Sequence, residues 1–189
     1  MYKFKPYGPF EVPVEEGRIV KDELKDFWDA VEKSNPGLKG AIGCYIFATR
    51  TGKSPRPWYV GKTERASFRK ESFQPQKLLL YEEALRKQKR GTPLLYLIAR
   101  LTTTGKLRAS AKGGQGLSSI GRLEVRLIET CLSRNSKLVN NRSTKHFLLT
   151  QVPGYMNEEP GARTREARDL ALLLGTKSKV KAPNAQIED

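Results

Sequence analysis

The apolar residues of this chain follow two periods, one typical of helices and one typical of strands. Helical spacing extends over four segments, 22–34, 75–90, 117–132 and 162–174. Shorter runs rich in apolar and aromatic residues predict strands at 41–49, 58–61 and 94–102. Gly and Pro residues follow most of these segments, as they do where helices and strands end. The pattern therefore predicts a chain in which helices alternate with strands.

The first two predicted strands are near enough in sequence to form a hairpin. Gly52 and two prolines occupy the segment 52–57, where we expect the turn. Thr63 is placed to cap a short helix that runs to Ser72. Several prolines lie in residues 1–19, which we expect to be irregular, and the glycine-rich run 112–116 predicts a flexible loop.

The chain has no internal repeat and no sharp linker, so we divide it by composition and pattern. The four parts are an N-terminal extension with one helix (1–39), a core (40–142), a C-terminal extension with one helix (143–175) and a disordered basic tail (176–189). We take the core to carry the function, because the candidate chemistry gathers there.

The chain is strongly basic. Its 189 residues include 35 Lys and Arg against 20 Asp and Glu, a net charge of +15. A protein of this charge is expected to bind a polyanion, most often a nucleic acid. A ribosomal protein, or a merely soluble basic protein, is the alternative. No apolar run is long enough to span a bilayer, so we expect a cytoplasmic protein that does not bind membranes.

Cysteine and histidine are too few for several kinds of site. Cys44 and Cys131 have no metal-ligand spacing, and we expect two buried thiols in a reducing compartment. His146 is the single histidine. It lies beside apolar residues, so we expect a structural role for it. A single histidine also excludes mechanisms that need several imidazoles.

Glu124 is the first candidate for chemistry. On a helical wheel it falls in the middle of the apolar face of helix 117–132, whereas Glu129 falls on the opposite, polar face. A buried carboxylate loses its hydration and needs a cation, which is either a metal ion or an arginine. Both alternatives stay open at this stage.

Two tyrosines and a basic pair make up the rest of the candidate site. Tyr45 and Tyr59 lie on the two strands of the predicted hairpin, so their hydroxyls can converge. A cation such as Lys62 would lower the pKa of a nearby phenol. Arg69 follows on the short helix and can hold a phosphate, with Arg65 as a competitor. Taken singly, tyrosines in strands are usually packing residues.

Together these residues resemble the GIY-YIG nuclease family. Gly43-Cys44-Tyr45 and Tyr59-Val60-Gly61 stand at its two tripeptides, and the remaining matches are Lys62, Arg69, Glu124 and Asn140. Asn141 stays open as an alternative to Asn140. The resemblance spans roughly residues 40–142. It implies an α+β fold with a small three-stranded antiparallel sheet flanked by helices, together with N- and C-terminal helical extensions.

The resemblance also implies a reaction and a role for each residue. A divalent ion, Mg²⁺ or Mn²⁺, would be bound by Glu124 and used to hydrolyse a phosphodiester bond in DNA. Tyr45 would activate water with help from Tyr59 and Lys62, and Arg69 would clamp the phosphate. Gly43, Gly61 and Asn140 would be structural residues around the site.

The chain departs from the family pattern at three positions. Thirteen residues, 46–58, separate the two tripeptides, so we expect an extended hairpin turn. Cys44 replaces an aliphatic residue. Phe73 stands where many members have Tyr or His, and Tyr81 is a candidate replacement from the next helix.

Basic residues outside the core are candidates for contact with nucleic-acid phosphates. They are Arg65, Lys112, the last helix's Arg163, Arg165 and Arg168, and the basic residues of helix 76–90 with Lys77 among them. A solvated basic face is the alternative for each.

The sequence therefore predicts a metal-dependent endonuclease acting on double-stranded DNA, either restriction-type or structure-specific. Cutting both strands calls for two active sites, hence a homodimer or transient pairing. The alternatives are a non-catalytic nucleic-acid-binding protein that keeps the fold, and a nuclease acting on RNA or branched DNA. The chain does not separate these substrates.

Overall fold

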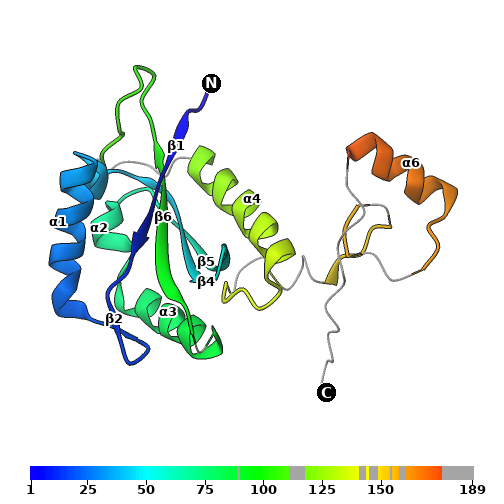
Figure 1. The fold of residues 1–189 in the computed structure, drawn as a ribbon. Coiled ribbons are helices and arrows are strands. Elements are labelled where there is room, and N and C mark those ends of the chain that lie inside the picture. The colour runs from blue at the N-terminus through cyan, green and yellow to red at the C-terminus, as the bar shows by residue number, and fades with distance from the viewer. Residues whose placement is uncertain are drawn as a thin grey trace. The chain divides into compact units, whose positions relative to one another are not determined.

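The computed structural model describes residues 1–88, 90–110, 118–140, 144, 149–153, 155–157 and 161–175. The chain divides into two compact units, Met1–Asn140 and Asn141–Asp189. Lys112, Asn141, His146 and the tail 176–189 lie outside the described residues, so the expectations for them are not addressed. Figure 1 shows the fold, and each unit is described by itself.

The first unit is built on a four-stranded antiparallel sheet. Its strands are β1 (Phe4–Glu11), β4 (Gly43–Thr51), β5 (Ser54–Thr63) and β6 (Thr92–Arg100), in the order β1-β6-β4-β5. A separate small hairpin joins β2 (Val14–Glu15) to β3 (Arg18–Ile19). The fold is therefore α+β as predicted, but its sheet has four strands where the resemblance implies three.

The additional strand is β1, which the sequence analysis wrongly took as irregular. Its prolines mislead, because Pro is tolerated in an edge strand, where a missing N–H need not break a ladder. Pro6 pairs with Ile98 of β6, and the register shifts between Tyr7 and Phe10, around Gly8-Pro9. The strand therefore forms despite its prolines, with one irregularity where Gly and Pro adjoin.

The hairpin β4–β5 is confirmed, but its turn is shorter than expected. Thr51 pairs with Ser54, so only Gly52 and Lys53 form the turn. Residues 54–57 belong to β5, again an edge strand that tolerates proline. One bulge lies opposite the step between Phe47 and Ala48. The extra length between the two tripeptides therefore lengthens the strands, not the turn.

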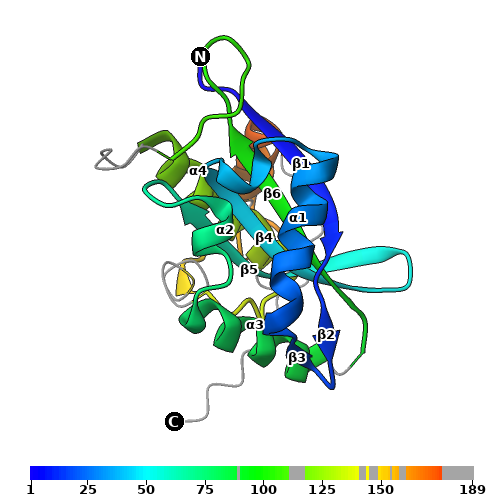
Figure 2. The same ribbon diagram turned by 90° about the vertical axis from the view of Figure 1, so that its left-hand side faces the viewer.

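Helices cover both faces of the sheet. The helices α1 (Leu24–Ser34), α2 (Phe68–Glu71) and α3 (Pro75–Gln88) lie on one face, and α4 (Ser118–Arg134) lies on the other (Figure 2). Short 3₁₀ turns, Lys21–Glu23 and Leu38–Gly40, flank α1. The helices predicted at 22–34, 75–90 and 117–132 are confirmed within a few residues. Thr63 is the last residue of β5, and Ser67 is the N-cap of α2.

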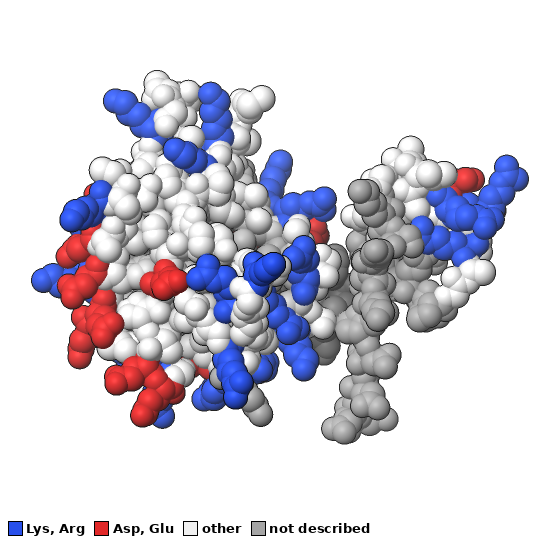
Figure 3. All heavy atoms as spheres, in the orientation of Figure 1, with Lys and Arg blue, Asp and Glu red and all other residues white. Residues whose placement is uncertain are grey.

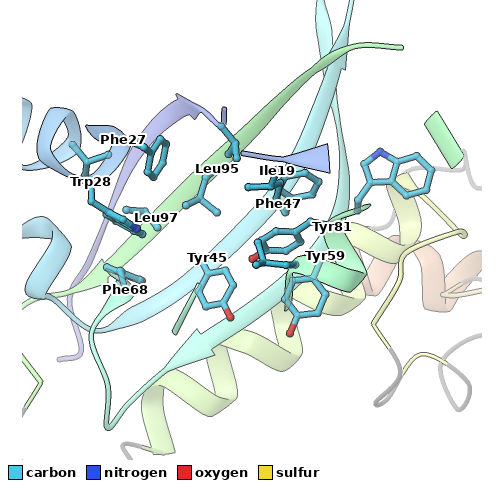
Figure 4. Close-up of a cluster of buried hydrophobic side chains, with 14 of the residues drawn as sticks. Ile19, Phe27, Trp28, Tyr45, Phe47, Tyr59, Phe68, Tyr81, Leu95 and Leu97 are labelled. Carbon is cyan, nitrogen blue, oxygen red and sulfur yellow. The ribbon is translucent and has the colours of Figure 1, made fainter. Parts of the chain in front are cut away.

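The main core lies between the sheet and helices α1, α2 and α3. Aromatic residues from several elements make it up, including Phe27 and Trp28 of α1, Phe68 of α2, Tyr81 of α3 and Phe47 of β4 (Figure 4). The rings of Phe47 and Tyr81 stack at 4.2 Å between centroids. On the other face, Ile120 of α4 packs on Ile42 and Cys44.

The exposed edge of β5 is covered by the segment that follows α4, residues 135–140. Asn135 donates a hydrogen bond from Nδ2 to the Pro57 carbonyl at 2.7 Å, and the Val139 amide donates to the Trp58 carbonyl at 2.8 Å. Asn140 accepts from the Val60 amide at 2.9 Å and donates to the Val60 carbonyl at 2.7 Å. These bonds satisfy backbone groups that an edge strand otherwise leaves unpaired.

The second unit contains the helix α6 (Arg165–Leu174), close to the predicted 162–174. The Thr164 hydroxyl caps it by accepting a hydrogen bond from the Ala167 amide at 3.2 Å. Its buried residues are Ala167 and Ala171, whereas Leu172 and Leu173 are exposed. Among the described residues, no helix has the length and apolar composition to cross a membrane.

Replacing Asn140 by Ala should destabilise the first unit. The change leaves the buried N–H and C=O of Val60 without partners, which costs about 2–4 kcal/mol. Chemical denaturation followed by circular dichroism measures the loss. Asn35→Ala serves as the control, since the Asn35 side chain bonds only the Ser34 hydroxyl in an exposed position, and should cost below about 1 kcal/mol. Equal costs for the two variants would contradict the role of Asn140.

Candidate active site

The alternation of side chains along β4 and β5 divides the candidate residues between the two faces of the sheet. Tyr45 stands opposite Gly61 and Phe47 opposite Tyr59, so both tyrosines face α1, α2 and α3. Cys44 stands opposite Lys62 on the face that α4 covers. Because β5 is an edge strand of the sheet, side chains on its two faces are separated only by that strand.

Gly61 lies against the side chain of Tyr45 on the neighbouring strand. A Cβ atom added at Gly61 would lie 2.5 Å from the Tyr45 hydroxyl oxygen, well inside contact distance. The Tyr45 ring therefore lies over Gly61, and any side chain there would displace it. Gly43 is constrained too, because its φ is +155° and a Cβ would overlap the Ile98 carbonyl oxygen. The structural roles expected for both glycines thus have a steric basis.

Three tyrosines form a cluster on this face. The centroids of Tyr45 and Tyr59 are 6.2 Å apart, and Tyr81 lies edge-on to Tyr59 at 5.7 Å. Figure 4 shows the hydroxyls of Tyr45 and Tyr59 pointing in the same direction. Within the described part of the chain, the buried hydroxyls of Tyr45 and Tyr81 have no hydrogen-bond partner. Such groups are costly unless water or a ligand satisfies them.

The Tyr45 phenol is held in its neutral form. Burial raises its pKa above 10.0, and the neighbouring Tyr81, Tyr59, Glu71 and Glu124 raise it further. The expectation that a nearby cation lowers this pKa is therefore wrong, because desolvation dominates. The Tyr45 hydroxyl therefore keeps its proton in the folded protein and is poorly suited to act as a base.

The cation beside the second phenol is Lys77 of α3, for which the sequence offered only a possible phosphate contact or a charged exterior. Its ammonium donates a hydrogen bond to the Tyr59 hydroxyl oxygen at 2.9 Å and lies 5.4 Å from the ring centroid. Lys77 precedes the core residue Tyr81 by one helical turn, so both face the same side of α3. The four-residue spacing of Lys77 and Tyr81 could have indicated this contact, but only with the knowledge that Tyr81 is buried beside Tyr59.

Lys62 lies on the other face of β5, between two carboxylates. Its Nζ is 3.4 Å from Glu124 Oε2 and 3.5 Å from Glu64 Oε1. Burial lowers the pKa of Lys62, but Glu124 and Glu64 together raise it above 10.5. Lys62 is thus paired with the acid of α4 and does not contact Tyr59. Glu64 was missed because nothing in its local pattern distinguishes it.

A glycine in α4 makes room for this ion pair. A Cβ added at Gly121 would lie 3.2 Å from the Lys62 ammonium and 3.7 Å from Glu64 Oε1. Glycine inside a helix costs about 1 kcal/mol relative to alanine. At this position it leaves a space on the helix surface for a cation, one turn before Glu124.

The two candidate arginines lie apart from these contacts. Arg69 is the second residue of α2, and Arg65 lies in the preceding loop, and both are exposed. Neither makes a hydrogen bond or ion pair with the other described residues. Arg163, Arg165 and Arg168 belong to the second unit. The structure therefore brings together Tyr45, Tyr59 and Lys77 on one side of β5, and Lys62, Glu64 and Glu124 on the other.

The donor set fits a divalent cation in part. Glu124 and Glu64 supply carboxylate oxygens, the ligands that Mg²⁺ prefers, around a position where the structure has an ammonium. Within the described ranges, no group of three or more His, Cys, Asp or Glu side chains is arranged to hold a metal ion. Any bound ion would therefore complete its coordination with water and substrate oxygens.

Comparison with known proteins adds no assignment. No family model matches the chain, and neither the curated proteins nor the solved structures give a significant match. The functional conclusion consequently depends on the residues and geometry of the site.

The cysteine beside the site should be unreactive in the folded protein. Burial raises the pKa of Cys44 from 9.0 to about 12, helped by Glu124 and opposed by Lys62. Burial likewise raises the pKa of Cys131 from 9.0 to about 11. At pH 8 both thiols should react far more slowly with a disulfide reagent than in the urea-unfolded chain.

The same shifts predict how stability depends on pH. The fold favours the neutral thiols, so their contribution is complete below pH 9 and is lost as the pH rises toward 11 and then 12. Urea denaturation across pH 8–11 should show a free energy of unfolding that falls as the pH rises. The fall should be smaller for Cys44→Ala than for the wild type. Thiols that react as fast in the folded protein as in the unfolded chain would contradict the raised pKa values of Cys44 and Cys131.

Proposed function

We propose that this protein is a divalent-metal-dependent nuclease, similar to the GIY-YIG family, that hydrolyses phosphodiester bonds in DNA. The observation that carries the proposal is the arrangement around β5: phenols on one side of the strand, and a lysine paired with the acid of α4 on the other. The resemblance in sequence concerns the same residues. These residues flank a single edge strand, and a phosphodiester bound at the end of that strand would meet both groups.

Each residue then has a role that its surroundings permit. Glu124 would hold the divalent ion with Glu64 beside it, and Lys62 would remain close as a further positive charge. When bound, the ion supplies Lewis-acid stabilisation of charge on the phosphate and on the leaving oxygen. Tyr45, as a neutral phenol, would donate a hydrogen bond to a phosphate oxygen, while the proton of the attacking water would pass to a neighbouring water molecule. Arg69, exposed on α2, is free to close onto the substrate phosphate.

Charge supports nucleic acid as the substrate class. In Figure 3 the acidic side chains of the first unit gather at the left and lower left, over α1 and the β2–β3 hairpin, whereas the side of α4 shows mainly basic ones. Exposed arginines of that helix are Arg122, Arg126 and Arg134. A polyanion is repelled from α1 and attracted toward the face that carries Lys62 and Glu124. Double-stranded DNA is the substrate we propose, cut by a homodimer or by transient pairing.

A non-catalytic nucleic-acid-binding protein is the competing function. The observation that favours it is the ion pair of Lys62 with Glu124, which already satisfies the carboxylate without a metal ion. That protein would bind DNA in a salt-dependent manner and cut nothing with any metal. RNA and branched DNA are further substrates to compare in the same assay.

Replacing Glu124 by Gln should abolish cleavage and leave DNA binding intact. Loss of the metal-holding carboxylate is expected to lower the rate of plasmid nicking about 10³-fold in Mg²⁺ or Mn²⁺. Wild-type nicking should stop in EDTA. Fluorescence anisotropy in Ca²⁺ should show duplex affinity within about threefold of wild type. The change affects only the contact that the metal ion makes with phosphate and leaves the contacts of the basic side chains in place.

The matched control is Glu129→Gln on the same helix. Glu129 pairs with Arg126 at 3.4 Å on the outer face of α4, away from Lys62. This variant should cut as fast as wild type. Undiminished cleavage by Glu124→Gln would overturn the metal role, and wild-type protein that binds DNA but never nicks it would establish the competing function.

A further inference from the structure

Lys77 differs from the other paired lysines of the described chain. Lys39, Lys62 and Lys87 each face a carboxylate, at 3.2 Å, 3.4 Å and 2.6 Å respectively. Lys77 instead donates to the hydroxyl oxygen of Tyr59 at 2.9 Å and is half-buried. Among the described residues no carboxylate forms an ion pair with it. A partly desolvated ammonium without a counter-charge is well suited to an anion from outside the protein.

We propose that Lys77 is a substrate residue of this site, which binds a phosphate oxygen while it holds the Tyr59 hydroxyl in place. The inference rests on the proposed function and gives a specific place in the site to a residue that lies outside the family motifs and that the sequence offered only as one of several possible phosphate contacts. An ammonium has three N–H donors, and Tyr59 uses one of them. The others are available to a non-bridging phosphate oxygen.

The position of the ammonium agrees with this role. The Tyr59 ring lies 6.2 Å from that of Tyr45, and both hydroxyls point the same way (Figure 4). Lys77 is hydrogen-bonded to one of these hydroxyls. A phosphate oxygen that contacts Lys77 would therefore lie beside the Tyr59 hydroxyl. A charge-assisted hydrogen bond from Lys77 would also stabilise the negative charge that develops on the phosphate oxygens as the reaction proceeds.

A purely structural Lys77 would behave differently. It would fix the Tyr59 ring through the hydrogen bond and the contact with the ring face, at 5.4 Å from the centroid. Its removal would then lower stability without altering how DNA affinity depends on salt. The salt dependence of binding is therefore the measurement that separates the two roles, because each phosphate contact adds about one to the slope of log affinity against log salt.

The test compares Lys77→Met, Lys77→Arg, Tyr59→Phe and the double variant Tyr59→Phe/Lys77→Met in the full-length protein. Duplex DNA binding is measured by anisotropy in Ca²⁺ across a salt series, and single-turnover cleavage in Mg²⁺. Lys87→Met is the control, since Lys87 lies on the same helix, is exposed and pairs with Glu83. Melting curves verify that each variant is folded.

Lys77→Met should reduce the salt slope by about one, and Lys77→Arg should restore it. Cleavage by Lys77→Met should fall about 100-fold. The double variant should lose much less than the product of the two single losses, because the two residues share one interaction. Lys87→Met should cleave like wild type.

An unchanged salt slope for Lys77→Met would overturn the inference, as would cleavage equal to that of the Lys87→Met control. If Lys77→Met does not fold, Lys77→Gln replaces it, and an unchanged slope for that variant is equally decisive. If the wild type binds DNA but does not cut it, the proposed nuclease function fails. The salt slope then still tests Lys77 as a phosphate contact.

Discussion

The pairing of β4 with β5 is the constraint on which the candidate site depends. Its register sets Tyr45 against Gly61 and Cys44 against Lys62, so a shift by one residue would exchange the faces of every side chain on β5. The absence of a side chain at Gly61 lets the Tyr45 ring lie across the edge strand. Asn140 and Asn135 then hold the outer edge of that strand.

Burial and pairing divide the charged and polar groups of the site into two sets. On the face of α2 and α3, desolvation keeps Tyr45 and Tyr81 neutral and leaves their hydroxyls without partners in the described structure. On the face of α4, Glu124 keeps its charge partner, the Lys62 ammonium. A phosphodiester needs both kinds of group, hydrogen-bond donors around its oxygens and a cation beside them.

The hairpin, three long helices and the burial of Cys44 could be predicted from the sequence, because period and turn residues are local signals. The strand β1 could not, since prolines in an edge strand resemble a loop until the neighbouring strand is known. The partners of Lys62 and Tyr59 could not be assigned either. Both tripeptides lie on one hairpin, but which cation reaches which group depends on α3 and α4, and their packing is a tertiary property.

The central claim is that the edge of β5 beside α4 binds a divalent cation. Paramagnetic broadening of backbone amide signals by Mn²⁺ in the isotope-labelled protein tests it most directly, with no substrate present. Signals of Lys62, Glu64, Gly121 and Glu124 should broaden at the lowest Mn²⁺ concentration. Broadening confined to the acid-rich segment 22–32, which includes most of α1, would contradict the claim.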